Sequence, residues 1–137
     1  MKFSVLFLLV LFSTISFSQE TPIQSPRIVV KVPLGESITL EGHTVKFIKV
    51  LEDSRCPKNT NCIWAGRAKV LVEVLSEETE TIQKELIFGK VNPGESDDLT
   101  LFSSNEKNIN AIVLDPYPSS EDTADSKKYV LLINVEN

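Results

Sequence analysis

Short segments in which apolar and polar residues alternate are the feature that most restricts how this chain can fold. The clearest covers residues 68–75, where Val70, Val72 and Val74 would lie on one face of an extended strand. Successive side chains of a β-strand point to opposite faces, so this spacing predicts a strand with one buried face. No segment has apolar residues at spacings of three and four over ten positions, which an amphipathic helix requires. The sequence therefore predicts an all-β protein.

Seven other segments are rich in β-branched and aromatic residues and are bounded by Gly, Pro, Asn, Asp or Ser, which favours strands separated by turns. They cover residues 28–32, 37–40, 44–51, 82–88, 98–103, 110–114 and 129–135. Seven to eight short strands are typical of a small sandwich or a partly open barrel, and we expect one of these two architectures.

Residues 1–18 match the pattern of a secretory signal peptide. Lys2 supplies a positive start, an apolar run follows to Phe12, and Ser16 and Ser18 are small residues at the positions that precede cleavage. A membrane anchor is the alternative, but an apolar run of about 10 residues is half of the roughly 20 that a membrane-spanning helix needs. We expect cleavage after Ser18, which leaves residues 19–137 as one β-rich domain, periplasmic or secreted.

The charge of the mature chain argues against two classes of partner. Without Lys2, the 14 Lys and Arg become 13, against 19 Asp and Glu, which is a net charge of −6. The basic residues form no clustered stripe, so neither a nucleic acid nor an anionic membrane surface is an expected partner.

Two cysteines, Cys56 and Cys62, lie between the third and fourth predicted strands, and the chain has no others. Export places them in an oxidising compartment, and the five residues between them can form a turn, so we expect a disulfide. A redox pair would favour the spacing C-x-x-C, and a zinc site would need two further ligands that the single histidine cannot complete. We expect no cofactor.

The segment around the cysteines has a distinctive order of residues. It reads Asp53-Ser54-Arg55-Cys56-Pro57, four further residues, and Cys62-Ile63-Trp64-Ala65-Gly66, and a Pro-Tyr-Pro turn follows a later strand at Asp115-Pro116-Tyr117-Pro118. These residues resemble a family of exported bacterial proteins and lipoproteins that carries no assigned activity. The resemblance implies a small β domain in the envelope or periplasm. This chain lacks the lipid-accepting cysteine of the lipoprotein members.

The motif residues are interpreted as structural. Trp64 follows Cys62 by two positions, so in an extended segment it would pack over the disulfide in the core, the alternative being an exposed ring that stacks on a sugar or a partner. Gly66 would supply a special backbone angle or a close approach. Asp53 and Arg55 would form an ion pair or cap the turn near Pro57, the alternative being a binding role for Arg55.

No catalytic group of residues stands out. His43 is the only histidine and falls in a predicted turn, where a solvated residue is the simplest interpretation. The acidic segments Gly94 to Asp98 and Asp115 with Glu121, Asp122 and Asp125 offer oxygen ligands, but they lack the pattern of a calcium loop and are interpreted as solvated.

We therefore expect a non-enzymatic domain that binds a protein or an envelope component through loops on a rigid scaffold. One alternative is a protease inhibitor that presents the loop from Cys56 to Cys62, with Lys58 and the flanking Arg55 offered to the protease. The other is a hydrolase that uses a pair of carboxylates, although nothing in the sequence selects two of the acids.

Overall fold

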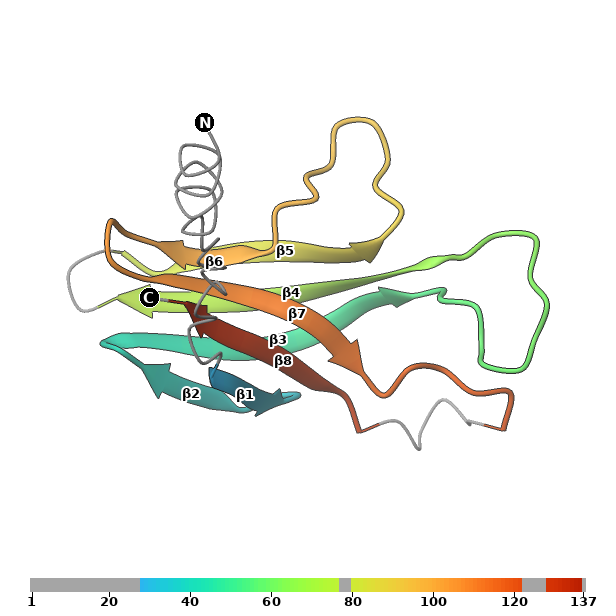
Figure 1. Cartoon of the computed structure of the whole chain (residues 1–137), viewed down its shortest axis with the longest axis horizontal. Helices are drawn as coiled ribbons and strands as arrows, with labels where there is room; N and C mark the ends of the chain where they lie inside the picture. The colour runs from blue at the N-terminus through green and yellow to red at the C-terminus, as the bar shows by residue number, and fades with distance from the viewer. Residues whose placement is uncertain (1–27, 77–79, 122–127, 137) are drawn as a thin grey trace, which may run out of the picture.

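The computed structural model describes residues 28–76, 80–121 and 128–136, which form eight strands arranged in two four-stranded antiparallel sheets. One sheet has the order β1-β8-β7-β6 and the other has the order β2-β3-β4-β5 (Figure 1). The strands are β1 (Ile28–Pro33), β2 (Ser37–Leu40), β3 (His43–Asp53), β4 (Arg67–Ser76), β5 (Ile82–Gly89), β6 (Thr100–Ser103), β7 (Asn108–Asp115) and β8 (Val130–Glu136).

The core lies between the two sheets and is built from the inward-facing positions of each strand. In β4 the predicted face is confirmed, because Val70 and Val72 are fully buried and Val74 is nearly so. Leu131 and Ile133 of β8 supply the opposing layer from the other sheet. Burying one aliphatic side chain of this size contributes about 1.5–3 kcal/mol, so the alternation found in the sequence is the main source of cohesion.

The sheets are not closed on one another, so the prediction of an all-β sandwich is confirmed and the partly open barrel does not form. Each sheet keeps two edge strands, β1 and β6 in the first and β2 and β5 in the second. Every predicted strand is present, with ends that differ by at most two residues.

The long strands β3 and β4 carry one connection well beyond the body of the sandwich (Figure 1). This connection, residues 54–66, contains both cysteines and is called here the disulfide loop. The segment that follows β7 lies at the same end, whereas the turns between β2 and β3 and between β6 and β7 lie at the opposite end (Figure 1).

The predicted signal peptide, residues 1–18, lies outside the described residues, as do Asp122 and Asp125. Within the residues that the structure describes, no helix is long and apolar enough to cross a membrane.

Candidate functional site

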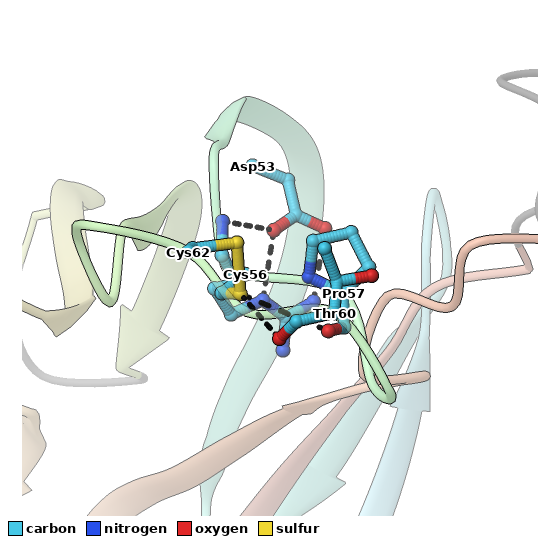
Figure 2. The surroundings of a disulfide bond; sticks show 6 residues. Asp53, Cys56, Pro57, Thr60 and Cys62 are labelled. Atoms are coloured by element: carbon cyan, nitrogen blue, oxygen red, sulfur yellow. Dashed lines mark hydrogen bonds and ion pairs between the residues drawn. A yellow bond between two sulfur atoms is a disulfide. The ribbon is translucent and has the colours of Figure 1, made fainter.

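The disulfide loop is closed at its base by a covalent bond and by backbone hydrogen bonds. Cys56 and Cys62 form the predicted disulfide, with their Cα atoms 6.0 Å apart (Figure 2). The amide of Ser54 donates to the carbonyl of Arg67 at 2.8 Å, and the amide of Cys56 donates to the carbonyl of Ala65 at 3.0 Å. The two arms of the loop are therefore joined to each other before the strands begin.

At Gly66 the two arms approach each other closely. Its φ is +69°, and a Cβ atom placed on it would lie 1.8 Å from the carbonyl oxygen of Ser54. Both reasons given for this glycine from the sequence therefore apply, because the backbone angle and the space each exclude a side chain.

Asp53 and Arg55 form a buried ion pair beside the disulfide. Arg55 Nε donates to Asp53 Oδ1 at 2.8 Å and Arg55 Nη2 donates to Asp53 Oδ2 at 2.9 Å. Both side chains are only 6% exposed. Such a two-point pairing holds the guanidinium in one orientation, as a single ammonium group could not. Asp53 and Arg55 therefore form the expected ion pair, and the Arg55 side chain is buried.

The remaining donors of Arg55 reach across to the end of β7. Nη1 donates to the carbonyl of Leu114 at 2.6 Å, and Nη2 donates to the carbonyl of Pro116 at 3.0 Å. The guanidinium also lies 5.0 Å from the centre of the Tyr117 ring. Two segments about 60 residues apart in the sequence are thereby joined, and they are the two halves of the motif on which the resemblance rests.

A second contact reinforces this junction through the backbone. The amide of Lys58 donates to the carbonyl of Pro118 at 2.9 Å, and Lys58 and Ser119 form an isolated parallel bridge. Residues 115–119 therefore brace the disulfide loop from the side of the other sheet. The buried ion pair and its contacts with Leu114 and Pro116 are called here the arginine clamp.

The Asp53 carboxylate stays ionised within the clamp. Burial by itself raises its pKa, but hydrogen bonds from Arg55 and from the Tyr129 hydroxyl outweigh burial, so that the pKa is lowered. The Tyr129 oxygen lies 2.9 Å from Asp53 Oδ2. The clamp is thus an ionised and hydrogen-bonded unit, which is how a charge is tolerated in a nearly dry position.

The exposure of Trp64 contradicts the prediction that its ring is buried. The ring is 74% exposed and does not pack over the disulfide in the core, and its neighbour Ile63 is 92% exposed. The prediction assumed an extended segment after Cys62, whereas the chain between Cys62 and Gly66 is irregular and turns back towards β4. Without a strand, positions two residues apart need not share a side. The arm of the disulfide loop between Cys62 and Gly66 consequently presents two large apolar side chains to solvent.

Two lysines near this segment each lie over an aromatic ring. Lys90, just after β5, places its ammonium 5.8 Å from the centre of the Trp64 ring. Lys58 lies 5.9 Å from the centre of the Tyr117 ring, which is itself exposed. We call Lys58, Ile63, Trp64, Lys90 and Tyr117 the tip surface.

The acidic segment from Gly94 to Asp98 is exposed, as expected from the sequence, except at Glu95, which is partly buried. Glu95 pairs with Arg67 and, at 2.9 Å, with Lys69 on β4. Hydrogen bonding from Lys69 and from the Asn92 amide, together with Arg67, lowers the pKa of Glu95 to about 2. Asp98 accepts a hydrogen bond from Lys84 at 2.6 Å. These carboxylates fold their loop onto the sheet, and no group of three metal-ligating side chains occurs in the described part of the chain.

His43 begins β3 and does not lie in the preceding turn. Its ring packs against Phe102, with ring centres 3.6 Å apart, and Nδ1 lies 3.0 Å from the carbonyl oxygen of Glu41. The residue therefore joins the two sheets at the end of the sandwich remote from the disulfide loop.

The geometry bears on both alternatives named from the sequence, the carboxylate hydrolase and the protease inhibitor. Hydrogen bonds and ion pairs lower the pKa of five described carboxylates, Glu41, Glu52, Asp53, Glu95 and Asp98. The inhibitor hypothesis loses one of its two basic residues, because Arg55 is buried in the clamp.

The sequence did not single out Ile63, Tyr117 or Tyr129 as site residues. Ile63 stands beside the only tryptophan in a loop, and this adjacency was the available signal. Nothing local marks Tyr129 as a partner of Asp53, because the contact depends on how the sheets are stacked. Comparison with family models, with curated proteins and with solved structures finds no match for this chain.

Proposed function

We propose that this protein is an exported, non-enzymatic binding domain that inserts Ile63 and Trp64 of the disulfide loop into an apolar site on a partner protein. The observation that carries the proposal is the exposure of these two consecutive side chains, 92% for Ile63 and 74% for Trp64. Large aromatic residues dominate the energetics of protein interfaces when they fill a pocket.

Exposure of single apolar residues is common, and Ile82 on β5 is itself 60% exposed. The pair at positions 63 and 64 differs because both residues belong to the disulfide loop, which projects beyond the body of the sandwich (Figure 1). Both side chains of one short segment are available together, which suits insertion into a concave surface.

The scaffold of the loop also favours binding. The disulfide, the arginine clamp and the contact between Lys58 and Pro118 restrain the loop from three sides. A loop that is already ordered loses less conformational entropy when it binds, and this increases affinity.

The export part of the proposal is supported by the signal-peptide pattern in residues 1–18. The disulfide is compatible with a periplasmic or extracellular location.

Site-specific photocrosslinking in cells tests the proposal. A benzophenone amino acid is introduced at position 63 and, as the matched control, at position 82, where an isoleucine is also exposed but lies at the far end of β5. We expect a discrete protein adduct from position 63 and none of the same mass from position 82.

Competition defines specificity in the same experiment. An excess of the purified wild-type domain should abolish the adduct, whereas the Trp64→Ala domain should compete at least tenfold less well. Absence of an adduct at position 63, or equal competition by both domains, would rule out binding through this loop.

A further inference from the structure

The tip surface differs in charge from the rest of the molecule. Residues 54–66 include Arg55 and Lys58 but no Asp or Glu, although the chain as a whole has a net charge of −5. Arg55 is neutralised by Asp53. The exposed charge within the loop is therefore that of Lys58, and Lys90 adds a second positive charge over Trp64.

These two lysines also differ from the other basic residues nearby. Arg67, Lys69 and Lys84 each pair with a carboxylate. Among the described residues, Lys58 and Lys90 pair with none and instead lie over the Tyr117 and Trp64 rings. An ammonium group held over an aromatic face keeps most of its hydration and its charge, so it stays available to an incoming anion.

From this arrangement, and resting on the function proposed above, we propose that the partner is an acidic protein surface. It combines an apolar pocket for Ile63 and Trp64 with carboxylates at the pocket rim that meet Lys58 and Lys90. Opposite charges around an apolar contact increase the association rate and discriminate against partners that lack the carboxylates.

An anionic membrane would also offer negative charge beside an apolar medium. The overall negative charge of the protein opposes that occupant, because an anionic bilayer presents a continuous negative surface to the whole domain. A protein pocket needs complementary charge only at its rim. The acidic protein is therefore the occupant that the charges favour.

Charge reversal under the photocrosslinking probe tests this proposal. The benzophenone stays at position 63 while Lys58→Glu/Lys90→Glu is compared with Lys46→Glu/Lys49→Glu, which makes the same change in net charge at exposed positions of β3. We expect the adduct yield to fall about tenfold in the first double variant and to change less than twofold in the second. The neutral variant Lys58→Gln/Lys90→Gln should give an intermediate loss.

Mass spectrometry of the adduct provides an independent readout. The crosslinked peptide of the partner, or the surface adjoining it, should carry Asp or Glu. Thermal unfolding of each double variant checks that the domain is folded, because all four lysines are exposed and their replacement should leave the melting temperature within a few degrees.

The outcomes separate this inference from the proposed function. A normal adduct yield in Lys58→Glu/Lys90→Glu, or an equal loss in both charge-reversed variants, would overturn the acidic partner and leave binding through Ile63 and Trp64 intact. Trp64-dependent sedimentation of the purified domain with phosphatidylglycerol vesicles would overturn it in favour of a membrane. Absence of any adduct at position 63 in the wild-type background would overturn both proposals.

Discussion

Gly66 shows how one residue controls the shape of the disulfide loop. Its backbone passes so close to Ser54 that a methyl group would overlap the carbonyl oxygen, which lies 1.8 Å from the Cβ position. Gly94 has a similar positive φ of +88°, but nothing lies within 4 Å of its Cβ position. The two glycines therefore separate the energetic cost of a backbone angle from the cost of a steric clash.

We predict that Gly66→Ala lowers the free energy of unfolding by about 3 kcal/mol or more, because backbone strain and overpacking both act there. Gly94→Ala should cost only about 1 kcal/mol, the usual penalty for a side chain at a positive φ. Urea unfolding of both variants measures the difference. Equal losses of unfolding free energy in the two variants would show that the close approach to Ser54 does not constrain position 66.

The exposure of the Trp64 side chain is also decided by the local path of the backbone. Its position after a disulfide suggested burial, but an irregular loop has no periodicity to decide where a side chain points. No residue next to Trp64 in the sequence distinguishes exposure from burial.

At the scale of elements, the arginine clamp joins the end of β3 to the end of β7. Arg55 satisfies Asp53 on its own side and the carbonyls of Leu114 and Pro116 on the other sheet. Arg67 is more exposed, at 16%, and pairs with Glu52 and Glu95 on the outer side of β4. The same residue type thus occurs in a buried and in a partly exposed ion pair.

We predict that Arg55→Lys lowers the free energy of unfolding by about 2–3 kcal/mol, since lysine cannot reproduce the paired contact with Asp53 while also reaching two carbonyls. Arg67→Lys, the control, should lower the free energy of unfolding clearly less than Arg55→Lys, as expected for a more solvent-screened pair. Chemical denaturation with both variants tests this. A loss at Arg67 as large as that at Arg55 would argue against a special role for the clamp.

At the scale of the whole molecule, ion pairs at several loops link folding to pH. Glu95 and Asp98 have their pKa lowered to about 2 in the folded state, mainly by hydrogen bonds from Lys69 and Lys84 respectively. Their unfolded values are about 4.3 and 3.9. The folded state therefore binds fewer protons, so both groups stabilise it fully above about pH 5 and lose that contribution as the pH falls towards 2.

We predict that the denaturation midpoint of the wild-type protein decreases steeply between about pH 5 and about pH 2. Glu95→Gln/Asp98→Asn should be less stable at neutral pH and should show a shallower decrease, since two of the linked protons are removed. Glu36→Gln, which replaces an exposed acid outside any ion pair of the described residues, should follow the wild-type curve. If the denaturation midpoints of all three proteins fell in parallel with pH, Glu95 and Asp98 would not link folding to pH.

The sequence alone determined the secondary structure and the all-β class of this protein. Alternation of apolar residues predicted each strand because burial of one face is a local property of an extended chain. The number of strands and the absence of a helical pattern predicted a sandwich or barrel, and two cysteines behind a signal-peptide pattern predicted the disulfide. Asp53, Arg55 and Gly66 were identified because their spacing around the cysteines is distinctive.

Only the tertiary structure decided what the disulfide loop presents and what holds it. The two backbone carbonyls that accept from Arg55 lie 59 and 61 residues away, and the basic partners of Glu95 lie on β4. Such contacts depend on how the sheets stack and how the loops return, which local periodicity does not encode. For the same reason the exposure of Ile63 and Trp64 emerged only when the irregular path of the loop was known.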